Sequence, residues 1–326
     1  MSAKQLTIGV DLGGTKIETV VADAEGNVLG EDLRPTLAAE GPAAVIARIA
    51  GSIRDAASRA NVALADTLGV GISAPGPAKP KLGIVTDAPN LPGWHNIHVT
   101  KLLSEAVGLP VLLENDANAA AYGECRFGAA KGLQHIVYVT LGTGIGGGII
   151  IDGKIYEGAS GAAGEVGHMV VLPDGPVCNC GNRGCVEALS AGPAIARDAA
   201  ALIAGGKAPK LAELAGEAPP TAKLVHEAAL QGDEEAREII HRAGYYLGLG
   251  LTGLLNIFDP QALILGGGLT NLGELYLGPA IETARKGAFP QIVADVLITT
   301  ANLGNRAGAL GAAALVISRP PAYPTE

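Results

Sequence analysis

The sequence predicts an α/β protein made of two halves with related topology. The first observation is a strand, a glycine turn, a second strand, a tight turn and a third strand, in order from about Leu6. The second is that the same order returns near Ile136, with the turn LGTGIGGG and a hairpin that has Asp-Gly at its tip. The third is size, because 326 residues, 48% of them hydrophobic, are enough for roughly two domains.

In the first half, the segments LTIGV, IETVVAD and VLGEDL predict the three strands. A helix is expected over about 42–61, because Val45, Ile46 and Ile49 recur on one face. The strand TLGVGIS follows, then a loop over 74–94 that is rich in proline and glycine, a short helix near 99–107, and the strand PVLLEND.

In the second half, HIVYVT predicts the first strand and ALILGGGLTN a later strand that ends in a glycine turn. The apolar run 245–258 is shorter than the roughly 20 residues that span a bilayer, so a buried helix is expected. We expect 205–220 to be a surface connection and 301–318 a closing helix, with a frayed tail.

The domain boundary is expected just after the strand PVLLEND. A smaller N-terminal domain would then span 1–117 and be joined by the C-terminal helix, 305–326. A larger C-terminal domain would span 118–304 and carry a cysteine-rich loop.

Charge and cysteine content limit the class of partner and the compartment. The net charge of -9 argues against a nucleic acid or an anionic membrane as partner, since phosphate groups need a basic face. The N-terminus runs almost directly into a strand, so no secretory signal is expected. Three of the four cysteines are clustered, which favours a metal site in a reducing compartment. We therefore expect a cytoplasmic protein.

Three glycine turns follow predicted strands and are candidate phosphate sites. Glycine lets backbone N–H groups approach a phosphate closely, and threonine or lysine can add donors. Asp11, at the end of the first strand, could orient Mg²⁺ through water. Tight hairpins without a ligand are the alternative, and neither the dinucleotide nor the Walker fingerprint fits. The candidates for nucleotide binding are Asp11, Gly13, Gly14, Thr15, Lys16, Thr143, Gly144, Gly267 and Gly268.

The segment GEVGHMVVLPDGPVCNCGNRGCVEA combines the spacing C-x-C-x₄-C with an upstream histidine. Three thiolates, from Cys178, Cys180 and Cys185, and the imidazole of His168 satisfy the closed tetrahedral coordination of structural Zn²⁺. Such a site has no open position for water, so the metal is expected to hold the loop rather than to catalyse. The remaining thiol, Cys125, is expected to be a core residue.

Asn115 and Asp116 follow a strand and precede an alanine-rich helical run. One interpretation is helix capping, for which both residue types are preferred. The other is that Asp116 accepts the proton of a substrate hydroxyl as its oxygen attacks the γ-phosphate of a nucleotide. Phosphoryl transfer needs an in-line nucleophile, neutralised charge and a positioned proton acceptor, and a carboxylate at a strand end can be that acceptor.

Taken together, DLGGTK, GTGIGGG and GEVGH followed by CNCGNRGCVE resemble the ROK family of sugar kinases and repressors, from about Ile8 to Ala314. The resemblance implies the actin-like ATPase fold shared with hexokinases, in which two ribonuclease H-like α/β domains surround a cleft for ATP and sugar. It also implies that Asp116 is the catalytic base and that His168 is shared between zinc and sugar. The residues implied to bind the sugar are Gly76, Asn90, Asn115, Asp116, Glu165, His168 and Glu187.

The activity implied by the resemblance is ATP- and Mg²⁺-dependent phosphorylation of a hexose, with glucose converted to glucose 6-phosphate. Fructose, mannose or N-acetylmannosamine are alternative substrates, and polyphosphate is an alternative donor. A sugar-responsive regulator is a further alternative, but family repressors carry an N-terminal helix-turn-helix domain, for which the five residues before the first strand leave no room. The family also implies a homodimer or homotetramer.

Overall fold

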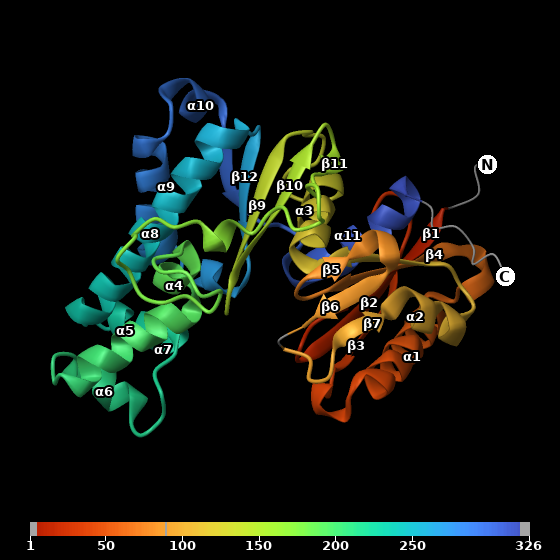
Figure 1. Cartoon of the computed structure of the whole chain (residues 1–326), viewed down its shortest axis with the longest axis horizontal. Helices are drawn as coiled ribbons and strands as arrows, with labels where there is room; N and C mark the ends of the chain where they lie inside the picture. Colours follow the sequence, from red (N-terminus) through yellow and green to blue (C-terminus); the bar gives the residue numbers. More distant parts are fainter. Residues whose placement is uncertain (1–4, 89, 320–326) are drawn as a thin grey trace. The chain divides into compact units, whose positions relative to one another are not determined.

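The computed structural model describes residues 5–88 and 90–319 (Figure 1). Its strands are β1 (Leu6–Leu12), β2 (Lys16–Ala22), β3 (Val28–Pro35), β4 (Thr67–Ala74), β5 (Ala78–Lys79), β6 (Ile84–Asp87), β7 (His95–His98), β8 (Val111–Asn115), β9 (Ile136–Leu141), β10 (Ile145–Ile151), β11 (Lys154–Ile155), β12 (Ala262–Gly266) and β13 (Leu297–Thr300). Its helices are α1 (Pro42–Ala60), α2 (Val99–Val107), α3 (Asp116–Arg126), α4 (Val186–Ser190), α5 (Gly192–Ala204), α6 (Pro209–Ala215), α7 (Ala222–Leu230), α8 (Glu234–Phe258), α9 (Glu274–Gly287), α10 (Pro290–Asp295) and α11 (Ala307–Ser318).

Two five-stranded sheets have the same order of neighbours. The first runs β3-β2-β1-β4-β8 and the second β11-β10-β9-β12-β13. In the first sheet β1 is antiparallel to β2 and parallel to β4, and β4 is parallel to β8. In the second, β12 is parallel to both β9 and β13. The repeated pattern in the sequence therefore corresponds to a repeated topology.

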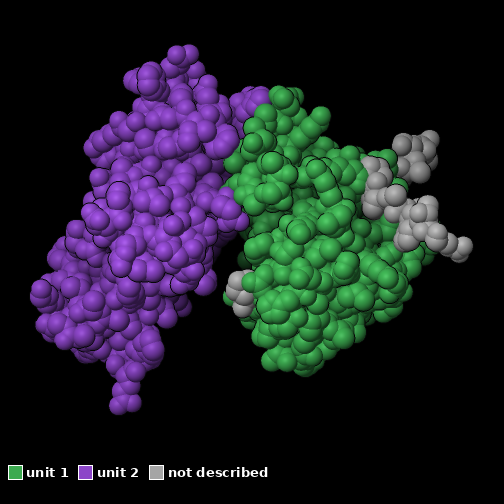
Figure 2. Space-filling model, viewed as in Figure 1, with its two compact units in different colours: residues 1–134, 148–164, 302–326 green, residues 135–147, 165–301 purple. Residues whose placement is uncertain are grey.

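The chain forms two compact units, which Figure 2 shows in different colours. Unit 1 contains residues 1–134, 148–164 and 302–326, and unit 2 contains 135–147 and 165–301. The chain passes from unit 2 to unit 1 within β10. Unit 1 continues beyond residue 117 because α3 packs against α11. The domain boundary expected from the sequence stays a prediction. Of the C-terminal segment 305–326 that was expected to join the first domain, the residues beyond Arg319 lie outside the described part of the chain.

The core of unit 1 depends on the close approach of α11 to the first sheet and to α3. A Cβ on Gly9 of β1 would lie 1.8 Å from the carbonyl oxygen of Ala309, and one on Gly71 of β4 would lie 2.0 Å from that of Ala312. On α11 itself, a Cβ at Gly311 would lie 1.7 Å from the backbone oxygen of Ala119. Glycine is required at these positions because backbone atoms occupy the space of a side chain.

In unit 2, α8 supplies the main apolar helix face. Its leucines at 247, 251, 254 and 255 are buried, whereas Tyr245 and Ile257 are exposed. The helix expected over 245–258 is thus the second half of a longer amphipathic helix. Within the part of the chain that the structure describes, no helix combines the length and apolar character that crossing a membrane would need.

Three expectations were wrong in detail. The segment 205–220 contains the helix α6, because its Ala, Leu, Lys and Glu residues favour a helix and Leu211 is fully buried. The loop expected over 74–94 includes β5 and β6, which pair with each other and with β7 in a small sheet. The closing helix begins at Ala307, after a turn in which Gly304 has a φ of 57°.

Candidate functional site

The β1–β2 turn in unit 1 is a tight glycine turn. Gly13 donates its backbone N–H to the carbonyl oxygen of Lys16 at 2.9 Å, and the Thr36 hydroxyl donates to the Gly13 carbonyl at 2.6 Å. A Cβ at Gly14 would lie 2.9 Å from the Cβ of Asn90, so the loop that carries Asn90 closes over the turn. Lys16 is half-exposed and donates to Glu18 at 2.9 Å.

Asp11 lies at the end of β1, where the turn begins. The Ser73 hydroxyl donates to its Oδ1 at 2.6 Å, and a Cβ at Gly308 of α11 would lie only 2.7 Å from the same oxygen. Burial raises the pKa of Asp11, and the hydrogen bond from Ser73 offsets only part of this effect. A cation near this carboxylate would favour its charged form, so the environment fits the role expected for Mg²⁺.

Asn115 and Asp116 lie where β8 passes into α3, and Asn115 is the N-cap of the helix. The Asn115 Oδ1 accepts from the backbone N–H groups of Ala117 at 3.0 Å and Asn118 at 3.2 Å. Capping therefore accounts for the Asn115 oxygen. The Nδ2 of Asn115 points to the Gly76 carbonyl at 3.5 Å. Asp116 is half-buried in the first turn, where its Oδ1 accepts from the Ala117 N–H at 2.8 Å.

The loops before β5 and before β7 hold two of the expected sugar ligands. Gly76 has a φ of 80°, and a Cβ there would lie 2.4 Å from the Asp87 carbonyl oxygen, so only glycine fits. Asn90 is exposed, and its loop is anchored by the fully buried Trp94. Unit 1 thus brings Asn115 next to Gly76 and Asn90 next to the β1–β2 turn.

Two further glycine turns meet in unit 2. The backbone N–H of Gly192, the first residue of α5, donates to the Gly142 carbonyl at 2.9 Å. Gly267 has a φ of 87°, and a Cβ there would lie 2.4 Å from the Leu141 carbonyl oxygen. The turn after β12 therefore packs directly against the end of β9, and Thr143, Gly144, Gly267 and Gly268 are all exposed there.

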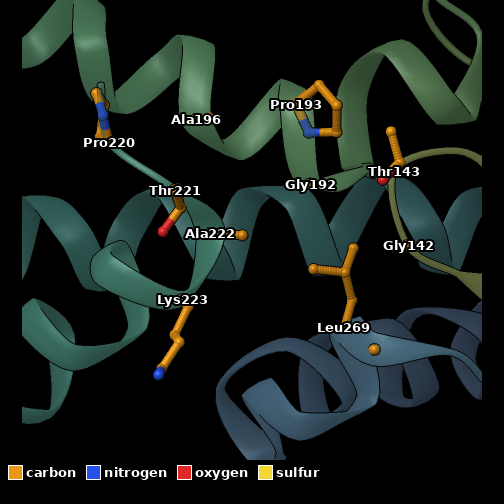
Figure 3. Close-up of a pocket in the computed structure, with 11 residues that line it drawn as sticks. Gly142, Thr143, Gly192, Pro193, Ala196, Pro220, Thr221, Ala222, Lys223 and Leu269 are labelled. Carbon is orange, nitrogen blue, oxygen red and sulfur yellow. The ribbon is translucent and has the colours of Figure 1, made fainter. Parts of the chain in front are cut away.

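A cavity of about 390 Å³ opens beside these turns (Figure 3). Thr143 lies on one wall, Leu269 on another, and the first residues of α5 and α7 border it. Helix N-termini present N–H groups and partial positive charge to an anion. The cavity is lined by Gly142, Thr143, Gly192, Pro193, Ala196, Pro220, Thr221, Ala222, Lys223, Gly268 and Leu269.

The cysteine loop in unit 2 brings its four expected ligands together. One ligand atom from each of His168, Cys178, Cys180 and Cys185 lies within 4.8 Å of the others. The Sγ atoms of Cys180 and Cys185 are 3.7 Å apart, close to the roughly 3.8 Å expected for two thiolates on a tetrahedral zinc ion with 2.3 Å bonds. The donor set and its spacing fit a metal ion.

Charge in this cluster also favours a cation. Burial, followed by the neighbouring thiols of Cys180 and Cys178, raises the pKa of Cys185 to about 12. Three thiolates in one place would repel each other, so a bound cation is needed to hold them deprotonated at neutral pH.

The two glutamates next to the cluster have different surroundings. Glu165 is exposed, and its Oε2 lies 3.8 Å from the Nε2 of His168, whose Nδ1 faces the Cys178 Sγ at 3.6 Å. Glu187 is half-buried, and its Oε2 accepts from the Ile145 backbone N–H at 2.9 Å. Glu187 therefore connects the cysteine loop with the turn that contains Thr143.

Comparison with known proteins identifies the family of the chain. The model of the ROK family matches residues 7–319. The chain belongs to the ROK family. It has the actin-like ATPase fold of the ROK sugar kinases, to which its similar solved structures belong.

Both sugar kinases and repressors of the ROK family resemble the chain. It is 39% identical to a glucokinase of Thermotoga maritima, over 96% of this chain and 97% of that protein. It is also 32% identical to a xylose repressor of Caldicellulosiruptor bescii, over 97% of this chain and 79% of the repressor. Relatives that are 32% to 39% identical to the chain therefore include both a kinase and a repressor.

Two solved ROK structures are similar over almost the whole chain. One is a hexokinase of Thermus thermophilus, with a TM-score of 0.82 and 37% identity over 95% of this chain and 97% of that one. The other is a glucokinase of Streptomyces griseus in complex with glucose and AMPPNP, with a TM-score of 0.78 and 38% identity over 95% and 98% of the two chains.

Sequence reasoning missed part of the cavity of this ROK protein. Pro193, Thr221 and Lys223 were not candidates, since they come from segments far apart in the sequence and have no phosphate-binding motif of their own. The available signal was the start of each helix, with Pro193 near the first position of α5 and Thr221 as the N-cap of α7.

Proposed function

We propose that this chain transfers the γ-phosphoryl group of ATP to glucose and forms glucose 6-phosphate. The observation that carries the proposal is its similarity, over nearly the whole chain, to a glucokinase solved with glucose and AMPPNP. The glycine turns, the cavity beside α5 and α7, and the carboxylate at the start of α3 are the parts that such a reaction needs.

In the proposed reaction, the 6-hydroxyl oxygen of glucose attacks the γ-phosphorus, and the bond to the β,γ-bridging oxygen breaks to release ADP. Asp116 accepts the hydroxyl proton. Its place in the first turn of α3, where the Ala117 N–H bonds Oδ1, fixes the carboxylate in the partial positive charge of a helix N-terminus.

The nucleotide is proposed to lie with its phosphates at the glycine turns, near Thr143, Gly144, Gly267 and Gly268, and with its base in the cavity of unit 2. Asp11, Gly13, Gly14, Thr15 and Lys16 of unit 1 are also proposed to bind the nucleotide. Mg²⁺ bound with ATP would neutralise phosphate charge, and Asp11 would orient it through water.

The sugar is proposed to bind through Gly76, Asn90, Asn115, Glu165, His168 and Glu187. Carboxylates accept strong, charge-assisted hydrogen bonds from hydroxyl groups. Structural Zn²⁺ on His168, Cys178, Cys180 and Cys185 would order the loop that presents three of these residues. The Nδ1 of His168 faces the thiols, which leaves Nε2 for a sugar hydroxyl.

A homodimer or homotetramer is the assembly that the family resemblance implies, and light scattering would measure it.

Steady-state kinetics test the reaction and its specificity. The purified protein with ATP and Mg²⁺ should release ADP and glucose 6-phosphate in equal amounts, with a higher kcat/KM for glucose than for mannose, fructose or N-acetylmannosamine. Replacing ATP by polyphosphate tests the donor. If no hexose increases ADP release, the kinase proposal is wrong. Sugar-dependent DNA binding without turnover would favour a regulator instead.

A further inference from the structure

Glu114, in β8, is a buried carboxylate to which the proposed reaction gives no role. Its side chain is 1% exposed, and it directly precedes the two residues proposed to bind sugar and accept the proton, Asn115 and Asp116. Burial raises the pKa of Glu114, while hydrogen bonds from Asn115 and Asn118 and the charge of Arg319 act in the opposite direction. A buried carboxylate is costly to keep, so its contacts need an explanation.

One oxygen of this carboxylate accepts hydrogen bonds from a residue before Asp116 in the sequence and from a residue after it. Its Oε1 accepts from the Asn115 backbone N–H at 3.0 Å and from the Asn118 Nδ2 at 3.1 Å. Asn115 precedes the proposed base and Asn118 lies two residues after it, so a single oxygen ties the end of β8 to the first turn of α3. The Asn115 side chain then caps the same turn through Ala117 and Asn118.

The other oxygen, Oε2, has no hydrogen-bond partner among the described residues. The Nη1 of Arg319 lies 3.7 Å from it and is held by Glu157 at 2.6 Å. This distance is too long for a hydrogen bond, so Arg319 attracts the carboxylate without competing for Oε1. A buried acceptor without a partner lowers stability. Stability alone therefore does not account for a glutamate at this position.

We propose that Glu114 is a positioning residue for phosphoryl transfer, which fixes the Asn115 backbone and the first turn of α3 so that Asp116 meets the sugar hydroxyl in line. The proposal rests on the proposed kinase function. It needs only the hydrogen bonds to Oε1, so an amide oxygen at the same place should suffice. A displacement of about 1 Å in a reacting group lowers a rate by about 100-fold.

The decisive experiment compares Glu114→Ala with Glu114→Gln in the glucose assay. Glu114→Ala removes both hydrogen bonds, and kcat should fall by roughly 10- to 100-fold, by a larger factor than KM for glucose rises. The Kd of a non-hydrolysable ATP analogue should change less than about threefold, since neither hydrogen-bond partner of Glu114, Asn115 or Asn118, is proposed to bind the nucleotide. Glu114→Gln retains an oxygen acceptor and should keep kcat within about threefold of the parent protein.

Asp32→Asn is the matched control. Asp32 is also a buried carboxylate of unit 1, 4% exposed, and it accepts from Ser52, Arg34 and Arg59 at β3. Its replacement should lower the Tm and leave kcat unchanged. If Glu114→Ala folds and keeps kcat within twofold, or if Glu114→Gln loses as much activity as Glu114→Ala, the proposal is wrong.

If Glu114→Ala does not fold, Asn118→Ala takes its place, since it removes only the donor at 3.1 Å. Its kcat should fall by about 3- to 10-fold, and its Tm should also fall because a buried hydrogen bond is lost. An unchanged kcat would overturn the proposal. An inactive parent protein would refute the kinase function itself, which separates the two failures.

Discussion

At the scale of single residues, the segment from Glu114 to Asn118 caps α3 and contains the residues proposed to bind sugar and to accept the proton. Asn115 is both the N-cap of α3 and a proposed sugar ligand, because its oxygen satisfies the helix while its Nδ2 remains directed to the Gly76 loop. The two interpretations of this segment are therefore compatible. A helix cap gives the proposed base a fixed backbone, which a loop would not.

Asp116→Asn tests the proposed base with little structural change. The amide oxygen can still accept from the Ala117 N–H, but it cannot take a proton. We expect kcat to fall by about 100- to 10,000-fold, while calorimetry shows glucose affinity within a few-fold of the parent protein. A variant with kcat within tenfold of the parent would assign proton transfer to another group.

Asp32 gives a residue-scale prediction on pH. Burial alone would raise its pKa, but hydrogen bonds from Arg34, Ser52 and Arg59 outweigh this effect and hold the pKa below the ordinary value. A depressed pKa in the folded state means that ionised Asp32 stabilises the fold above about pH 4, and that this contribution is lost as pH falls through the folded pKa. Urea unfolding between pH 7 and 3 should show a weaker pH dependence in Asp32→Asn, and an unchanged slope would contradict the assignment.

At the scale of elements, the sequence predicted most strands and helices because their signals are local. Alternating apolar residues, glycine turns and proline at helix starts fix β1, β2, α1 and α2 to within a residue or two. The sheet β5-β6-β7 was missed because its strands have only two to four residues, too few for a periodic pattern. The cavity was missed in part for another reason, because segments distant in sequence line it.

The residues of the candidate site also divide into those with a local signal in the sequence and those without one. Residues with a recognisable spacing, such as Cys178, Cys180 and Cys185, could be grouped from the sequence as candidate metal ligands, and the structure brings them together. Glu114 could not, because a glutamate within a strand carries no signal until its two hydrogen bonds are seen. Spacing indicates which residues could share a metal ion, but it gives no sign of a residue proposed to act through its neighbours.

Helix α11 provides the element-scale prediction. Gly311→Ala would place a methyl group against the backbone of Ala119, so we expect the free energy of unfolding to fall by about 1–3 kcal/mol. Gly253→Ala in α8 is the control, because no atom lies within 4 Å of its Cβ position, and it should be neutral or add up to about 1 kcal/mol. Equal effects of the two substitutions on denaturant unfolding would show that the α11 contact is not tight.

At the scale of the whole molecule, the metal should influence sugar binding through the order of the cysteine loop. Chelation is expected to increase amide hydrogen exchange across 164–187 and to raise KM for glucose several-fold or more, since the loop loses its cross-link. Zinc added back should reverse both changes. Normal exchange and KM in metal-free protein would contradict the coupling.

Two cysteine variants test which thiols bind the metal, one as the test and one as its matched control. Cys180→Ser should lose bound zinc, as measured by elemental analysis. Cys125→Ser should keep it, because Cys125 lies on α3, where its Sγ faces the Leu133 carbonyl rather than the cluster.

The packing of α11 has a consequence for biosynthesis. Unit 1 needs this helix against β1, β4 and α3, yet the ribosome makes β1 first and α11 about 300 residues later. Until then, the apolar strands of the first sheet have no partner for the face that Gly9 and Gly71 present to the helix. We expect nascent chains that end before residue 302 to be sensitive to proteases across β1–β4 and to depend on chaperones, since this half of the protein cannot complete its fold during translation.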